Sequence, residues 1–158
     1  MTARHTVVVR RVLGALPEAV FDEWLDPEAM AEWMCPLPAR CLGVEIDPRI
    51  GGRFRIEIEE DGIRFAVTGR YEELHRPDRL RFTWSCTNWS EPTHRSIVTV
   101  TFESRGAAET TMTIRHELLP PGLGPRHERG WVAIAKQLSD AVRTRTAPGT
   151  SRPARGGR

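Results

Sequence analysis

The sequence contains no apolar run that approaches the roughly 20 residues a helix needs to cross a bilayer. The apolar run near the N-terminus covers only residues 7–9, which is shorter than the core of a secretory signal peptide, and no small-residue cleavage pattern follows it. We therefore expect a cytoplasmic protein with no membrane partner.

Cysteine is also scarce, because the 158 residues include only Cys35, Cys41 and Cys86. Their number is odd and none of them forms a CxxC pair, so the spacing does not predict a disulfide framework. We expect three reduced cysteines with structural roles.

Motifs for metal, nucleotide and nucleophilic chemistry are missing. There is no HExxH, HxH or HxxxH spacing, and no P-loop, GxSxG or complete GxGxxG motif. Apart from His116, which is discussed below, the histidines fall on different expected elements: His5, His75, His94 and His127. We therefore expect no metal site and no cofactor.

The charge distribution divides the chain in two. Residues 143–158 carry five arginines, no acidic residue and few apolar side chains, whereas residues 1–142 are slightly acidic. A segment of that composition cannot bury enough apolar surface to offset the entropy of ordering, so we expect a disordered tail. An arm that binds nucleic acid nonspecifically is the alternative, and we favour a solvated tail without a specific nucleic-acid partner.

Hydrophobic periodicity predicts one α+β domain over residues 1–142. A β-branched run predicts a strand over 6–13, Pro17 then begins a short helix, and Asp26 caps a second short helix before Pro36. The period then changes from 3.6 to 2. The strands predicted by this alternation cover 41–46, 53–60, 64–74, 79–86, 95–104 and 109–117.

Turn residues between these strands, such as Asp61-Gly62, predict antiparallel hairpins. Alternation leaves one face apolar and the other polar, which is typical of a sheet covered on one side. A long helix over 125–142 has an apolar stripe through Trp131, Ile134 and Leu138 and would cover that face. Because such a sheet twists strongly, we expect a cavity between its concave face and the helix.

These patterns resemble a known superfamily in their order and spacing over residues 5–142. The residues that carry the resemblance are Pro17 to Trp24, Asp26-Pro27-Glu28 with Trp33, Asp47-Pro48-Arg49 with Gly51-Gly52, Gly69 in mid-strand, Arg79-Leu80 with Trp84, and Gly130-Trp131 with Leu138. The chain resembles the START-like helix-grip (SRPBCC) superfamily, within it the branch named for the C-terminal domain of the activator of Hsp90 ATPase.

The resemblance implies a helix-grip fold with an internal apolar pocket, but it does not imply one activity. Members include lipid and hormone carriers, aromatic polyketide cyclases, enediyne self-resistance proteins and co-chaperone domains, and the family offers no fixed catalytic set to carry over. Function must therefore be argued from the site.

Aromatic and sulfur-bearing side chains on the apolar face are the expected pocket lining. The candidates are Trp33, Met34, Phe54, Phe65, Phe82, Trp84, Met112, His116 and Trp131. The alternative that these side chains fill a solid core stays open. His116 and Tyr71 are candidates for acid–base chemistry. The alternative is a core histidine with a backbone partner, which is the more common case, and a satisfied tyrosine at the end of a strand.

We expect the protein to bind a small hydrophobic or aromatic molecule, such as a bacterial secondary metabolite, for carriage, sequestration or self-resistance. The first alternative is a cyclase or hydrolase that uses the same pocket, and we favour binding without catalysis. The second alternative is an Hsp90 co-chaperone-like module that binds protein. A weak homodimer is left open.

Overall fold

The computed structural model describes residues 5–146. Its elements follow in the order β1 (His5–Leu13), α1 (Pro17–Glu23), α2 (Pro27–Trp33), β2 (Arg40–Ile46), β3 (Arg53–Glu60), β4 (Ile63–His75), β5 (Arg79–Cys86), β6 (Ser96–Arg105), β7 (Glu109–Leu119) and α3 (Gly124–Thr146). None of the helices in this range is both long enough and apolar enough to cross a membrane.

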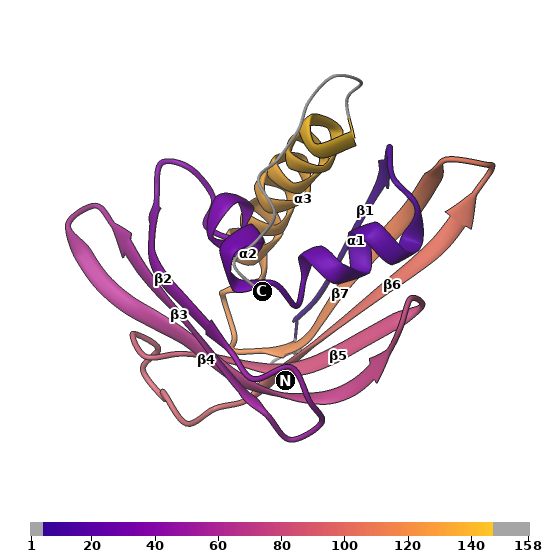
Figure 1. Cartoon of the computed structure of the whole chain (residues 1–158). Helices are drawn as coiled ribbons and strands as arrows, with labels where there is room; N and C mark the ends of the chain where they lie inside the picture. The colour runs from indigo at the N-terminus through magenta and orange to yellow at the C-terminus, as the bar shows by residue number, and fades with distance from the viewer. Residues whose placement is uncertain (1–4, 147–158) are drawn as a thin grey trace.

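The seven strands form one antiparallel sheet in the order β1-β7-β6-β5-β4-β3-β2. The sheet bends strongly, and all three helices lie on its concave side, with α3 running through the space between the two halves of the sheet (Figure 1). This is the predicted α+β helix-grip architecture, which is therefore confirmed.

Local sequence signals explain where the elements begin and turn. The Asp26 carboxylate accepts hydrogen bonds from the backbone N–H groups of Glu28 and Ala29, at 3.0 and 3.2 Å, and so caps α2. Between β3 and β4 the two-residue turn Asp61-Gly62 has φ of 54° and 78°. Two positive φ values define the type I′ turn whose twist matches that of a hairpin, so the sequence prediction of both features is confirmed.

The C-terminal helix is longer than its sequence pattern indicated. We placed the start of a disordered tail at residue 143, but α3 continues to Thr146. The extra turn is held by Arg145, whose guanidinium donates two hydrogen bonds to the buried Glu23 carboxylate and a third to Glu32. The rest of the predicted tail, residues 147–158, lies outside the described residues.

One continuous core joins the helices to the sheet. Helix α1 lies over β6 and β7, where the Phe21 and Phe102 rings meet edge to face with centroids 5.6 Å apart. Helix α2 packs against β2 and α3. The largest fully buried side chains include three indoles, those of Trp24, Trp33 and Trp131. The two short helices therefore cover part of the concave face, and Trp24 at the end of α1 reaches Phe82 on β5, with ring centroids 6.2 Å apart. The rest of that face lies opposite α3.

A glycine in the middle of β4 allows this tight curvature. A Cβ atom added at Gly69 would lie 1.9 Å from the Thr83 carbonyl oxygen and 2.5 Å from a ring carbon of Phe54, the residue paired with it across the strands. The close contact with backbone cannot be relieved by rotating a side chain. Phe54 covers the glycine and occupies the space that a side chain would otherwise fill.

We expect Gly69→Ala to lower the free energy of unfolding by about 1–3 kcal/mol through overpacking. Urea denaturation followed by tryptophan fluorescence measures this. Gly43→Ala on β2 is the matched control, because a Cβ there meets nothing within 4 Å. Equal stability of the two variants would contradict the role given to Gly69.

We expect Arg145→Met to cost about 3 kcal/mol of stability, because it leaves the Glu23 carboxylate buried without its charged partner. The control is Arg143→Met, which removes an exposed guanidinium that pairs with Asp140 and should cost under about 1 kcal/mol. Thermal denaturation of these two variants, of Glu23→Leu and of Glu23→Leu/Arg145→Met makes the comparison. A double variant as unstable as the sum of the Glu23→Leu and Arg145→Met losses would refute the coupling.

Candidate ligand-binding groove

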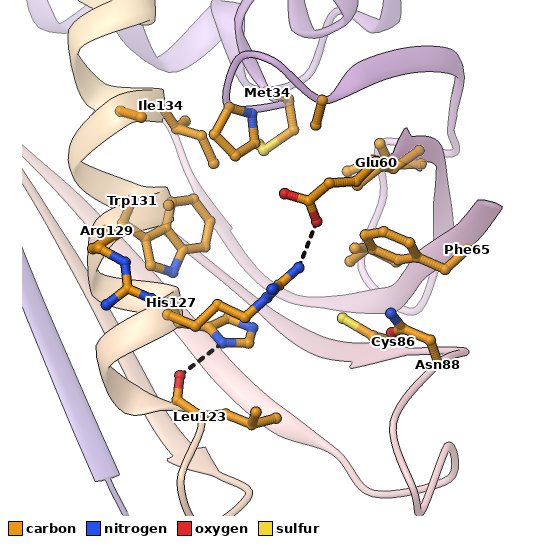
Figure 2. Close-up of a pocket in the computed structure, with 18 of the residues that line it drawn as sticks. Met34, Glu60, Phe65, Cys86, Asn88, Leu123, His127, Arg129, Trp131 and Ile134 are labelled. Carbon is orange, nitrogen blue, oxygen red and sulfur yellow. Dashed lines mark hydrogen bonds and ion pairs between the residues drawn. The ribbon is translucent and has the colours of Figure 1, made fainter. Parts of the chain in front are cut away.

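A groove of about 690 Å³ separates the first half of α3 from strands β3, β4 and β5. It opens to solvent past Leu37 and Ile63, which are 76% and 62% exposed. Its lining comprises Met34, Pro36, Leu37, Ala39, Ile56, Ile58, Glu60, Asp61, Ile63, Phe65, Val67, Trp84, Cys86, Asn88, Trp89, Leu123, Arg126, His127, Arg129, Gly130, Trp131, Ala133 and Ile134. Figure 2 shows the helix wall with Trp131 and Ile134 facing the sheet wall with Phe65 and Cys86.

The spacing of residues along each helix or strand explains which side chains form the two walls of the groove. On α3, His127, Gly130, Trp131 and Ile134 are three or four residues apart, so one face of the helix presents all of them to the groove. On β3, alternate residues such as Ile58 point to the concave side of the sheet. The deep part of the groove is therefore apolar on both sides.

Charged side chains stand at the rim. The Arg126 guanidinium on α3 makes an ion pair with the Glu60 carboxylate at the end of β3, marked by the dashed line at Glu60 in Figure 2. Because both residues line the groove, this pair joins the helix wall to the sheet wall. Both side chains are partly solvent-exposed, so the pair contributes little to stability. Its position narrows the path by which a molecule reaches the apolar interior.

Behind the helix wall, a buried hydrogen-bond chain fixes the Trp131 ring. The Trp131 indole N–H donates to His116 Nδ1 at 3.0 Å, so that nitrogen carries a lone pair and His116 Nε2 carries the proton. Nε2 then donates to Ser96 Oγ at 2.7 Å, and the Ser96 hydroxyl donates to the Trp84 carbonyl at 2.7 Å. Both nitrogens of His116 are therefore engaged in a neutral ring, and burial lowers the pKa of His116 well below its ordinary value.

His127 lies at the groove itself. Its Nδ1 donates to the Leu123 carbonyl at 3.0 Å, which leaves the Nε2 lone pair on the other side of the ring. Burial lowers the pKa of His127, and the Arg126 guanidinium lowers it further, against the hydrogen bond to Leu123 that raises it. The ring is accordingly an uncharged surface at neutral pH, and its edge packs against His116 with centroids 5.2 Å apart.

The thiol of Cys86 also lines the groove. Burial raises the pKa of Cys86 to about 12, so at neutral pH the sulfur keeps its proton. All three cysteines of the chain are free. A protonated, buried thiol is a poor nucleophile, so Cys86 contributes shape and a weak S–H donor to the groove rather than covalent chemistry.

Four of the nine predicted lining residues meet at the groove: Met34, Phe65, Trp84 and Trp131. Phe54 and Phe82 instead line a small inner cavity of about 10 Å³, together with Tyr71, the other acid–base candidate. The inner cavity adjoins the groove, because Met34, Ile56 and Trp84 line both hollows. Whether any of these residues binds a ligand stays a prediction.

The remaining three predicted residues lie in the packed interior. Trp33 donates its indole N–H to Glu23 at 3.1 Å, next to the Arg145 ion pair. Met112 is fully buried on β7, at a position paired with Phe102. His116 is fully buried behind Trp131 and does not line the groove. Met112 and His116 share the concave face of the sheet with the groove residues but lie in its packed part, whereas Trp33 belongs to α2.

The sequence interpretation missed the rim and the entrance. Glu60 and Arg126 are 66 residues apart in the chain, so no local pattern relates them. His127 could have been found, because it precedes Trp131 by four residues and therefore shares its helical face.

Within residues 5–146, no three His, Cys, Asp or Glu side chains gather closely enough to hold a metal ion.

Comparison with known proteins finds a matching family and solved structures of similar architecture. The family model described as activator of Hsp90 ATPase homolog 1-like protein matches residues 15–143. A crystal structure of a Chromobacterium violaceum protein is similar with 32% identity and a TM-score of 0.76, over 86% of this chain and 96% of that one. An Hsp90 activator from Plasmodium falciparum is 21% identical with a TM-score of 0.71, over 87% and 95% of the two chains. No curated protein matches the chain.

The buried state of His116 predicts a pH-dependent stability. Below about pH 6.5 an unfolded chain takes up a proton on this histidine, whereas the folded chain does not until its lower pKa is reached. The contribution of neutral His116 is therefore complete above pH 6.5 and is lost as the pH falls below it. The difference in unfolding free energy between wild type and His116→Gln should shrink by up to about 1.4 kcal/mol per pH unit between pH 6.5 and 5.

Urea denaturation at several pH values measures that difference, and NMR of the His116 ring protons follows the protonation itself. A ring that titrates with an ordinary histidine pKa in the folded protein would show that the hydrogen-bond chain is not formed as described.

Proposed function

This chain belongs to the activator of Hsp90 ATPase homolog 1-like family, and from that premise we propose that its groove reversibly binds a small, mainly apolar molecule. The observation that carries the proposal is the groove itself, because the rest of the concave face is filled by side chains. Its volume of about 690 Å³ lies in the range of sites for small organic molecules, which are mostly apolar with a few placed polar groups.

The state of the two predicted acid–base residues favours binding over catalysis. A general base must reach its substrate with a free lone pair, but both His116 nitrogens are occupied and the ring lies behind Trp131. Burial raises the pKa of Tyr71, so its phenol stays protonated at neutral pH. Carriage, sequestration and self-resistance by sequestration each need only reversible binding, and the cytoplasmic location and the bacterial metabolite remain predictions.

A second candidate function follows from the family description and from the Plasmodium relative. The name of the family and that of the Plasmodium falciparum protein both refer to Hsp90 activation, so an Hsp90-binding module is the alternative. It predicts that the protein raises the ATPase rate of purified Hsp90, with or without a molecule in the groove. If the ATPase rate of Hsp90 does not change, this alternative is wrong and small-molecule binding is the function that stands.

We expect Gly130→Leu to abolish binding of a neutral aromatic probe. Gly130 lines the groove, and a Cβ there would lie 4.0 Å from Pro36 across it, so a leucine fills the space while improving the helix. The measurement is the fluorescence increase of N-phenyl-1-naphthylamine on titration with protein. The expected affinity loss exceeds about tenfold.

Gly130→Ala is the matched control, because its single methyl fits beside Pro36 without closing the groove. Both variants should be at least as thermally stable as the wild type, because glycine is a poor helix former. Unchanged affinity of Gly130→Leu, or a wild-type protein that binds no neutral aromatic probe, would contradict the proposal.

A further inference from the structure

Resting on the proposed function, we infer that the bound molecule presents an uncharged oxygen acceptor, as in a ketone, quinone or ether, to the indole N–H of Trp84. The inference names a chemical class for the guest rather than one compound. It follows from an unmatched hydrogen-bond donor on Trp84, a residue that lines both the groove and the inner cavity.

Trp84 stands where the two hollows meet. It lies on β5, is 6% exposed, and lines both the groove and the inner cavity. Its ring is held on one side by Trp131, with centroids 5.1 Å apart, and on another by His116 at 5.6 Å. Because Trp131 is itself fixed by His116, the Trp84 indole has a defined position in the wall.

The indole nitrogen of Trp84 is buried, and it has no hydrogen-bond partner among residues 5–146. Nearly all buried donors in folded proteins are paired, and an unpaired one costs about 1–3 kcal/mol. By contrast, the indoles of Trp33 and Trp131, on the same concave side, each donate to a specific acceptor. The unpaired donor therefore marks a place where an acceptor from outside the chain would be stabilised.

The Cys86 sulfur offers this donor only a weak acceptor. Burial raises the pKa of Cys86, and the nearby Trp84 indole N–H opposes that shift, but the contact lies outside the geometry of an ordinary hydrogen bond. A thiol sulfur is a weak acceptor. An oxygen acceptor would therefore form a stronger hydrogen bond with this indole than the sulfur does.

The inner cavity supports the same assignment. Trp24 lines it and also has a buried indole nitrogen without a partner among the described residues. The cavity volume of about 10 Å³ is close to the space that a single oxygen atom needs. A carbonyl or ether oxygen at this junction fits the available space, whereas a larger polar group does not.

The charge of the groove selects a neutral guest. Its formal charges, on Glu60, Asp61, Arg126 and Arg129, belong to the rim residues, and the first and third of these pair with each other. The deep lining around Trp84 consists of Met34, Ile56 and other uncharged side chains. A carboxylate or ammonium buried there would lose its hydration without gaining a counter-ion, which is strongly unfavourable.

The test compares 9-fluorenone with fluorene, two flat molecules that differ by one carbonyl oxygen. Isothermal titration of the full chain gives the ratio of their affinities. We expect Trp84→Phe to lower the fluorenone-to-fluorene ratio roughly 2- to 10-fold, the effect of one hydrogen bond. Trp89→Phe is the matched control, because Trp89 also lines the groove and its loss should leave the ratio unchanged.

A second readout does not depend on the stability of the variant. In a ¹H–¹⁵N NMR spectrum of the wild type, the Trp84 indole signal should move downfield with fluorenone and not with fluorene. If both compounds bind but the ratio and the signal do not depend on Trp84, the inference is wrong and the binding function stands. If neither compound binds, the proposed function fails and the inference fails with it.

Discussion

The hydrogen bond from the Trp131 indole to His116 is the interaction on which the groove depends. It ties the first half of α3 to the sheet at one point, with Trp131 Nε1 and His116 Nδ1 3.0 Å apart. At the far end of the helix, Arg145 ties the last turn to Glu23. Between strand β3 and these anchors, α3 is held at a spacing that its own side chains do not fill. The groove is thus a consequence of where the helix is fixed.

The fold could be predicted from the sequence because each of its signals is local. Asp26 caps α2, Asp61-Gly62 turns the β3–β4 hairpin, and alternation separates the two faces of every strand. The sheet then has one apolar face, and the amphipathic α3 is long enough to cover it. The extra turn of α3 could not be predicted, because it depends on an ion pair between Arg145 and Glu23, 122 residues apart.

The site could be predicted only in part, for a related reason. Alternation identifies the face of the sheet on which Phe54, Phe82 and Trp84 lie, but it does not tell which part of that face the short helices cover. Met112 therefore satisfies the same alternation as the groove residues while packing elsewhere. The rim depends on long side chains from a turn and a helix that meet only in the folded chain. Such contacts leave no periodic signal.

Family membership and the groove carry different information. The family shows the architecture, and its relatives of known structure share that architecture at low identity, so the likeness alone assigns no ligand. The structure of this chain adds an apolar lining, charged residues at the rim and a buried indole without a hydrogen-bond partner among residues 5–146. Under the proposed function, that combination favours a neutral guest with an oxygen acceptor.

The most direct measurement is isotope-filtered NMR on ¹³C-labelled protein with unlabelled N-phenyl-1-naphthylamine. If the groove binds the probe, its ring protons show nuclear Overhauser contacts to the methyl groups of both Ile58 and Ile134, one on each wall. Contacts confined to exposed methyl groups such as those of Val8 on β1, or no contacts at saturating probe, would contradict the account.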